Sequence, residues 1–534
     1  MATTTEMRMD GAADADVIVI GSGPGGLAAG AYLAAAGRRV IVVEARDVVG
    51  GHQSAMVRSG FEFELGLHYV TADPVRELLA PVGIACEFTS YDRDAMFTLH
   101  FPDSRVPLPL GFAAMQDRLA AEFPAERRAL RAFLTTIGAL DRDMRSLQGG
   151  LRPRDLSRLP RTVGRLLRYA RVTVGDYLDD LQVSPRLRTV LSWADGVFAL
   201  PPSRLPLLGY ASVVASYLTQ GVAYPKGGSK RITSGLAGVI RSHGGDVLVG
   251  TQATRILVEA NRVRGVRTAS VGREVELVAP VVVAAGDLKR TFLELLAPDA
   301  VPGRLLRRVR GLEMALPVAV VYLVVDRDLR AEGFPTTNPI AFSGDHGEAM
   351  YAAARGGQMP EGTVAHLWVG SIADPDNPGL CRPGQTNLQL IGVVPASHDF
   401  WGIVPGREPT PRYAERKRQV RNRLMAQADR VIPHLSESIV FEEMSTPVTD
   451  ERYMLTTGGT SYGITLTPEQ MLQRPGPVTP ISGLFLAGAS TRSMHGLVGC
   501  LTGGVAAAAA ILGSPPARLL GPLARPHLAA APVR

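Results

Sequence analysis

The stretch that decides the fold is VIVIGSGPGGLAAGAYLAAAGRRVIVVEARDVVGGH, residues 17–52. An apolar β-branched run at residues 17–20 predicts a buried strand that enters the pattern Gly21-x-Gly23-x-x-Gly26. Gly21 permits a tight turn from strand to helix, Gly23 lets the backbone approach a pyrophosphate, and Gly26 lets the helix pack on the strand. The helix that follows offers N–H groups and a partial positive charge to phosphate. The stretch therefore predicts a unit that binds the phosphates of a dinucleotide.

A second apolar strand is expected at residues 40–43, and it ends on Glu44. A carboxylate about twenty residues beyond the glycines can accept a hydrogen bond from a ribose 2′-OH. A GxGxxG pattern by itself is weak evidence. Placed between two strands, with an acid at the end of the second, it strongly indicates a bound dinucleotide.

The chain has 534 residues, more than one ordinary core, so we expect two domains or one large bilobal unit. Cys86, Cys381 and Cys500 lie far apart and form no CxxC pair, which favours a reducing compartment. The first 16 residues lack the apolar segment of a secretory signal. We therefore expect a cytoplasmic protein, and the sequence leaves its oligomeric state open.

The formal net charge is +7, and arginine supplies most of the positive charge. Such a balance can reflect an anionic partner or simply an arginine-rich composition, and we expect no nucleic acid partner. The charge is concentrated between Arg152 and Arg171, where leucine and valine alternate with seven arginines and one acid. That stretch can be a solvated helix face, or it can contact the anionic inner face of a membrane.

Two more passages repeat the pattern of strand, glycine and helix. The first, residues 224–286, predicts a helix at 232–242, strands at 247–249, 254–258 and 263–268, and a buried strand at 281–284. The second predicts a strand at 484–487 and a helix from Gly496, in an Ala/Gly-rich stretch that reads as a buried helix rather than a membrane span. Three separated segments thus favour one nucleotide-binding lobe.

The predicted fold class is α/β, with a Rossmann-type lobe built from discontinuous segments and a second lobe of mixed sheet and helices. We assign residues 15–90, 223–292 and 476–513 to the first lobe, and residues 91–222 and 293–475 to a substrate lobe. Residues 1–14 and 514–534 are expected to be flexible tails. Ligands at such sheets bind at the carboxyl ends of the strands, where the glycine turns converge.

These segments resemble a known family of flavoproteins. The fingerprint continues into Gly50-Gly51, and YPKGGSKRI, APVVVAAG and GLFLAGASTRSMHGLVG follow in order, together with GFEFELGLHYV near the start. The whole resembles the FAD-dependent phytoene desaturase, carotenoid isomerase and retinol saturase group, within the flavoprotein class of the amine oxidases. The resemblance implies bound FAD whose ring lies at the boundary with a substrate tunnel.

The resemblance also implies roles for particular residues. It implies that Gly21, Gly23, Gly26, Gly50 and Gly51 lie along the cofactor phosphates, with Glu44 at the adenosine ribose and Ala253 at the adenine. Gly488 would lie near the ribitol, and the helix from Gly496 would point its N-terminus at the flavin ring. Two positions depart from the family, which often has Arg where this chain has His52 and Asp where it has Ala489.

Few residues are obvious candidates for acid–base chemistry. The sequence shows no paired carboxylates and no His/Cys cluster with metal-ligand spacing, so we expect no metal site. His68 and His495 lie in the glycine-rich segments expected near the ring, and histidine titrates in the range that proton transfer requires. Each can carry a proton to or from substrate, or simply bond to backbone beside the cofactor.

The leading hypothesis is an FAD-dependent oxidoreductase that desaturates or saturates carbon–carbon bonds of a lipophilic polyene, by hydride transfer at flavin N5. Three alternatives stay open: a flavin-dependent cis–trans isomerase of a polyene, an amine oxidase-like enzyme, and a non-catalytic prenyl-binding chaperone of the same fold. The first needs no net oxidation of substrate, the second releases hydrogen peroxide from amines, and the third has no flavin.

Overall fold

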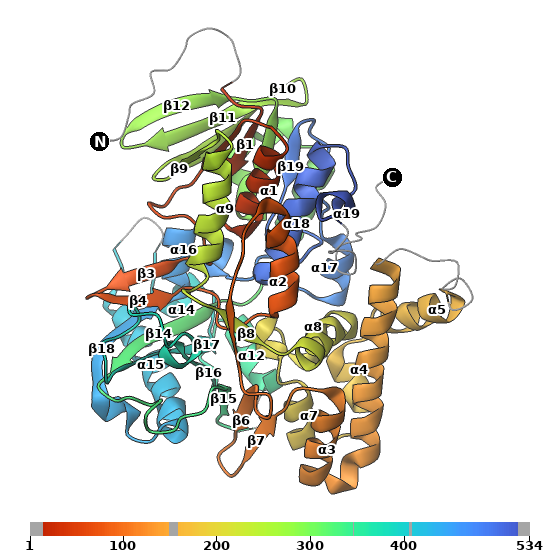
Figure 1. The fold of residues 1–534 in the computed structure, drawn as a ribbon, viewed down its shortest axis with the longest axis vertical. Coiled ribbons are helices and arrows are strands. Elements are labelled where there is room, and N and C mark those ends of the chain that lie inside the picture. The colour runs from red at the N-terminus through yellow and green to blue at the C-terminus, as the bar shows by residue number, and fades with distance from the viewer. Residues whose placement is uncertain (1–13, 149–158, 345–346, 405–407, 522–534) are drawn as a thin grey trace.

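The computed structural model describes residues 14–148, 159–344, 347–404 and 408–521. Its upper half in Figure 1 is built on a five-stranded parallel sheet. The strand order is β19 (Leu484–Leu486), β13 (Val281–Ala284), β1 (Val17–Ile20), β2 (Val40–Val43) and β9 (Asp246–Leu248). Because helices and a second sheet cover both faces, the strands are almost wholly apolar. The three segments predicted from the glycine turns therefore meet in one sheet.

Three helices cover one face of this sheet: α1 (Pro24–Ala35), α9 (Lys230–Ser242) and α18 (Gly496–Ile511). The close approach of α1 to α18 depends on glycine, since a Cβ at Gly504 would lie 2.3 Å from the carbonyl oxygen of Gly25. A three-stranded antiparallel sheet covers the other face, formed by β10 (Gln252–Glu259), β11 (Arg262–Ser270) and β12 (Arg273–Val278). Short helices continue this lobe: α10 (Leu288–Arg290), the π-helix η6 (Thr291–Leu295) and α11 (Gly303–Gly311).

The lower half in Figure 1 is built on a seven-stranded mixed sheet. Its order is β18 (Ile439–Ser445), β14 (Val318–Val325), β17 (Thr386–Val393), β16 (Val364–Val369), β15 (Asn338–Phe342), β6 (Phe97–His100) and β7 (Arg105–Leu108). The long helix α15 (Pro411–Val431) packs against it and closes an apolar core that includes Leu390 and Trp401. Smaller elements frame this sheet: β3 (Ala55–Arg58), β4 (Phe61–Glu64), α12 (Gly347–Arg355), α13 (Gly370–Ala373), α14 (His398–Trp401), α16 (Pro447–Met454) and α17 (Pro468–Gln473).

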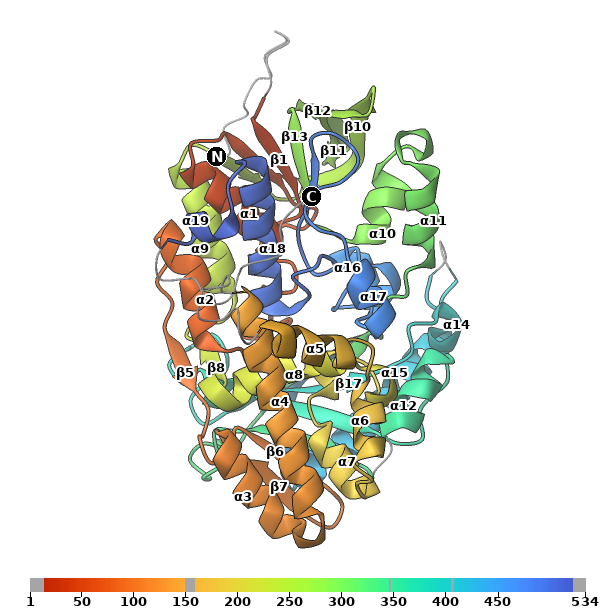
Figure 2. The same cartoon turned by 90° about the vertical axis from the view of Figure 1, so that its right-hand side faces the viewer.

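A group of helices lies beside β6 and β7, as Figure 2 shows. It consists of α3 (Phe112–Glu122), α4 (Arg127–Gln148), α5 (Leu159–Tyr169), α6 (Val174–Asp180), α7 (Pro185–Leu191) and α8 (Leu207–Gln220). Helix α2 (Ala72–Leu79) and the strand pair β5 (Phe88–Ser90) and β8 (Ala223–Pro225) join this group to the first lobe. No helix among the described residues is both long enough and apolar enough to span a bilayer.

The predicted fold class is confirmed, and the helix from Gly496 is the buried α18. The lobe boundaries stay predictions, and packing crosses one of them, since Val309 and Leu312 belong to the core beneath the parallel sheet. Most of both predicted tails lies outside the described residues. Within the C-terminal one, α19 (Pro516–Leu519) is helical and Leu520 is buried in the first lobe, so an ordered element lies inside the stretch predicted as a tail.

Candidate active site

One cavity of about 1510 Å³ runs through the described part of the chain. It begins at Gly23 and Glu44 beside the parallel sheet, continues past the N-terminus of α18, and reaches α4 and α8 of the helical group. Pockets for a single small ligand usually measure 300–1,000 Å³. This cavity therefore has room for a dinucleotide and a second molecule end to end.

The glycine turn after β1 forms the first end of the cavity. Gly21 has a φ of +95°, which L side chains rarely adopt, and a Cβ at Gly26 would lie 2.1 Å from the carbonyl oxygen of Gly21. Gly23 lines the cavity, and no atom lies within 4 Å of its Cβ position. No side chain caps the N-terminus of α1, so its N–H groups remain available to a phosphate.

Glu44 directly follows β2 at the same edge of the sheet and is 8% exposed. Its carboxylate accepts hydrogen bonds from the backbone N and the Oγ of Ser22, at 2.8 and 2.6 Å, and from the backbone N of Arg46 at 2.9 Å. These bonds hold the carboxylate against the glycine turn while it lines the cavity. The predicted acid thus lies beside the predicted phosphate cradle.

Gly50 and Gly51 follow with φ values of +116° and +55°, and Gly51 lines the cavity. A Cβ at Gly51 would lie 3.3 Å from Cα of Gly23, so the two glycine turns nearly touch. Arg46 donates from Nη1 to the carbonyl oxygen of Gly51 at 3.1 Å and fixes this second turn. The turn at the double glycine therefore lies against the start of α1 and forms part of the cavity wall there.

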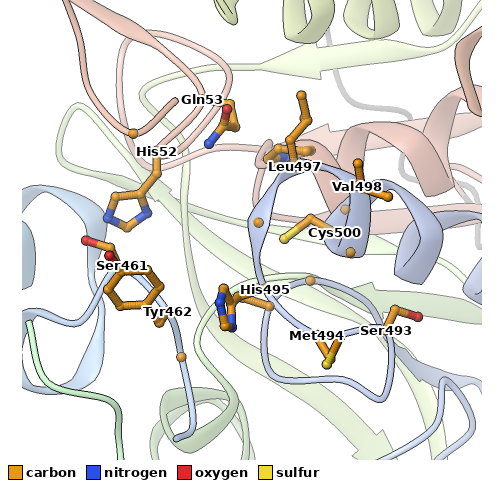
Figure 3. A pocket seen from close by; sticks show the side chains of 18 of the residues that line it. His52, Gln53, Ser461, Tyr462, Ser493, Met494, His495, Leu497, Val498 and Cys500 are labelled. Atoms are coloured by element: carbon orange, nitrogen blue, oxygen red, sulfur yellow. The ribbon is translucent and has the colours of Figure 1, made fainter. Parts of the chain in front are cut away.

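The next two residues present polar atoms that have no hydrogen-bond partner among the described residues. These are Nε2 of His52 and Oε1 of Gln53, both buried in the cavity wall. His52 Nε2 lies 3.8 Å from Oδ2 of Asp450, and Figure 3 shows the His52 ring next to Ser461 and Tyr462. Buried polar groups are normally paired. A polar cofactor in the cavity would supply hydrogen-bond partners for both atoms. In the sequence, His52 stood out only as a position where the family often has arginine.

Of the remaining predicted cofactor residues, two line the cavity and one does not. Gly488 and Gly496 line it with φ values of +90° and +78°, and Gly496 begins α18 with no side-chain cap. Ala253 lies on β10, 9% exposed, and is not among the described residues that line the cavity. The structure therefore brings together every predicted glycine region and Glu44, but not the side chain of Ala253.

His68 lines the middle of the cavity, but its ring is already hydrogen-bonded. Its Nε2 lies 3.0 Å from Oε1 of Gln389, whose own Nε2 donates to the carbonyl oxygen of Glu64 at 2.8 Å. The amide oxygen of Gln389 must therefore accept from His68, so Nε2 carries the proton. Burial lowers the pKa of His68 to about 4, so the ring is neutral at pH 7.

His495 is in a similar position just before α18. Its Nε2 donates to the carbonyl oxygen of Val197 at 2.9 Å, and burial lowers its pKa to about 4. In Figure 3 its ring lies beside that of Tyr462, and the two rings are in edge-to-face contact with their centroids 5.2 Å apart. Both histidines predicted as proton carriers therefore lie in the cavity, both are neutral because they are buried, and each donates its Nε2–H to a fixed acceptor.

The wall beyond the histidines is aromatic and apolar. Tyr69, Phe198, Tyr217, Trp368 and Tyr462 line it together with valines and methionines. A carboxyl group also lines it: Asp195, in the 3₁₀ turn η4 (Asp195–Val197), whose pKa burial raises to about 7. Sequence reasoning missed Asp195, because it lies in the inserted helical region and matches no motif.

The comparisons with known proteins agree with this geometry. Residues 24–382 match the family model described as flavin containing amine oxidoreductase. The chain is 24% identical to the all-trans-retinol 13,14-reductase of Danio rerio, across 93% of this chain and 86% of that protein. It is also 24% identical to prolycopene isomerase 1 of an Oncidium hybrid cultivar, across 93% and 84%.

Among solved structures, a putrescine oxidase bound to putrescine is similar, with a TM-score of 0.60, 18% identity, and 93% of this chain and 99% of that chain covered. At this identity the similarity shows the fold. FAD fits the cavity, since Gly23 leaves room for its pyrophosphate, Glu44 can accept from its ribose, and His52 and Gln53 offer unpaired polar atoms further along. The chain belongs to the family of flavin containing amine oxidoreductases and is an FAD-dependent oxidoreductase.

Proposed function

We propose that this enzyme adds or removes hydrogen across carbon–carbon double bonds of a lipophilic polyene of the retinoid or carotenoid class. The observation that carries the proposal is the long aromatic and apolar extension of the cavity beyond the cofactor cradle. A conjugated hydrocarbon chain needs such a wall, since it offers apolar surface to bury and few groups to hydrogen-bond. The names of the relatives, a retinol reductase and a prolycopene isomerase, agree with this substrate class.

The residues of the chain divide the work between binding and reaction. Glu44 and the glycine turns hold the dinucleotide part, and His52 and Gln53 hold polar atoms nearer the ring. The aromatic side chains align the substrate and exclude water, which preserves a reactive hydride. Bound FAD supplies the exchange of hydride.

We further propose that the helix α5 brings the enzyme to an anionic membrane surface on the cytoplasmic side, where lipophilic substrate dissolves. Arg161, Arg168 and Leu167 of α5 are exposed, Leu167 by 70%. Helix α5 packs on α4, whose Asp141, Met144 and Arg145 line the far end of the cavity. The sequence predicts a membrane contact through the stretch from Arg152 to Arg171. The exposed side chains of α5 support only the later part of that stretch, because residues 152–158 lie outside the described residues.

The test uses the purified full chain with its flavin. It should absorb near 450 nm, and anaerobic incubation of the reduced protein with retinol or a carotenoid should give a product two mass units heavier. Oxidised protein incubated with a saturated substrate should give a product that is two mass units lighter.

The other outcomes identify the rivals. An isomer of unchanged mass would replace this proposal by the isomerase, and hydrogen peroxide released from amines but not polyenes would replace it by an amine oxidase. A protein that stays colourless with added FAD would exclude all of these activities and favour a non-catalytic binding protein.

A further inference from the structure

The turn η4 is held in the cavity wall by groups from three directions. Tyr462 donates from its hydroxyl to the carbonyl oxygen of Gly196 at 3.3 Å, and His495 donates to that of Val197 at 2.9 Å. On the other side His366 packs so closely that a Cβ at Gly196 would lie 2.7 Å from its Nε2. The turn is therefore pinned, and its first residue, Asp195, lines the cavity.

Among the described residues, the Asp195 carboxyl group bonds to one side chain, the hydroxyl of Tyr351 on α12, and to the backbone N–H of Gly196. A tyrosine hydroxyl can donate only one hydrogen bond, so the carboxyl group retains capacity for a proton and for substrate. Tyr351 also lines the cavity and is almost fully buried. The pair thus presents a positioned carboxyl to an apolar compartment.

Four other titratable groups near this turn are poor proton carriers. His68 and His495 each use their N–H on a fixed oxygen, and burial lowers the pKa of both to about 4. Burial also lowers the pKa of His366 to about 4, and it raises the pKa of Tyr462 to about 12. None of these four groups changes its charge near pH 7.

We propose that Asp195 carries the proton that accompanies hydride transfer to or from the polyene. This inference rests on the proposed function and deepens it. In saturation, the carbon–carbon π bond breaks, one carbon gains hydride, and its neighbour takes the proton from the Asp195 carboxyl. Substrate is reduced by two electrons while the cofactor is oxidised by two, and the Asp195 carboxylate regains a proton from water. A two-electron donor then restores the reduced cofactor, and desaturation runs the same steps backwards.

The electrostatic surroundings suit this role. Burial, and to a smaller extent Glu348 of α12, raises the pKa of Asp195, whereas the backbone N–H of Gly196 and the Tyr351 hydroxyl lower it, and together they give a pKa of about 7. The nearby ionisable groups also include Tyr210 of α8, Tyr462 and His366. A proton carrier works best when its pKa lies near the operating pH. Asp195 is therefore populated in both protonation states at pH 7.

The experiment compares D195N with wild type and with E348Q as a matched control. Glu348 is a neighbouring carboxylate that bonds to Ser203 and does not line the cavity. With dithionite as the electron donor, D195N should lose kcat for polyene hydrogenation by roughly 10²–10⁴-fold with little change in KM, because an amide cannot donate this proton. E348Q should keep kcat at low pH, where Asp195 is protonated, and should move the fall in rate to lower pH, because Glu348 raises the pKa of Asp195. D195E should recover part of the kcat that D195N loses. Flavin content and thermal unfolding report whether each variant folds.

A second readout does not depend on turnover. Wild-type protein should show an infrared carboxylic acid band that disappears as pH rises through about 7, and the difference between wild type and D195N isolates Asp195 from Glu64, whose pKa burial also raises to about 7. Hydrogenation by wild type should fall over the same pH range, because the acid form donates.

Three results would overturn the inference. A folded D195N with wild-type kcat and pH profile removes Asp195 from the reaction. The absence of a titrating infrared band would show that Asp195 does not exchange a proton near pH 7. Wild type that changes no polyene refutes the proposed function itself, and this inference falls with it.

Discussion

Burial raises the pKa of two carboxyl groups, Asp195 and Glu64, to about 7 among the residues that the structure describes, and their surroundings give them different roles. Asp195 faces the cavity, whereas Glu64 lies on β4 and does not line it. Glu64 accepts hydrogen bonds from the Tyr224 hydroxyl and from the backbone N and Oγ of Ser229. It ties the start of α9 to β4, so its role is structural.

Glu64 predicts a pH dependence of stability. Its pKa is about 7 when folded and near 4.5 in the unfolded chain, so its contribution is complete below pH 4.5 and is lost as pH rises through 7. The free energy of unfolding should fall less between pH 5 and pH 8 in Glu64→Gln than in wild type, by about 3 kcal/mol at most. Chemical unfolding at the two pH values measures this. Equal falls in both proteins would show that Glu64 does not titrate in this range.

Gly23 predicts a loss of cofactor without a loss of fold. Its φ of −63° and ψ of 169° suit alanine, and no atom lies within 4 Å of its Cβ position, but that position faces the cavity. Gly23→Ala should leave the free energy of unfolding of the apoprotein within about 0.5 kcal/mol, because it breaks no contact. It should weaken FAD binding at least tenfold in a fluorescence titration. Gly238→Ala, at an exposed glycine of α9 with similar free space, is the control that should bind FAD normally.

At the scale of elements, the packing of α1 against α18 brings the two ends of the cofactor site together. Both helices begin at cavity residues, and both point an uncapped N-terminus at the cavity. Small residues allow this contact: a Cβ at Gly25 would lie 2.7 Å from the backbone N of Gly488, and one at Gly504 would lie 2.7 Å from Cβ of Ala28. The helix contact and the glycine turn after β19 therefore depend on each other.

Gly504→Ala should push the two helices apart. Its Cβ would meet the carbonyl oxygen of Gly25 at 2.3 Å and the backbone N of Ala29 at 2.9 Å, and neither can yield without moving α1. We expect a loss of roughly 1–3 kcal/mol in the free energy of unfolding, the usual cost of overpacking. Gly238→Ala, the same change on a helix surface, should stabilise the protein instead. A melting temperature of Gly504→Ala at or above that of wild type would contradict the prediction.

At the scale of the whole molecule, the cavity connects three bodies of structure. Its cofactor end lies against the parallel sheet, its aromatic wall includes Trp368 of the mixed sheet and Phe198 at the end of η4, and its far end reaches α4 and α8. Figures 1 and 2 show α5 on the outside of α4. The exposed arginines of α5 therefore lie on the same side as this end of the cavity.

Replacing Arg161, Arg168 and Arg171 by glutamine should weaken sedimentation of the protein with vesicles of phosphatidylglycerol and phosphatidylcholine. Each lost charge removes about 1 kcal/mol of attraction to an anionic surface, so binding should fall by tenfold or more. Added salt should weaken the binding of the wild-type protein to these vesicles in the same way. Replacing Arg304, Arg307 and Arg310 of α11, which lies in the first lobe, provides a variant of equal charge that should still bind. Equal loss in both variants would mean that the net charge, not α5, attracts the protein.

Sequence alone determined the parts of this enzyme that depend on local backbone chemistry. Glycine turns, buried strands and the acid after β2 have requirements that nearest neighbours impose, so the parallel sheet, the cradle at Gly23 and the position of Glu44 could be predicted. Family resemblance then indicated the flavin. The resemblance concerned the backbone at Ala253, and the side chain of this residue does not line the cavity.

Only the tertiary structure decided which groups can hold a proton. His68 and His495 are ordinary histidines in the sequence, and burial in the folded protein keeps them neutral, while Gln389 and Val197, hundreds of residues away, accept their N–H groups. Asp195 carries no motif, yet the meeting of η4 with α12 and the cavity raises its pKa to about 7. The pKa of a group depends on the dielectric and charges that surround it, and distant segments supply these only after the chain has folded.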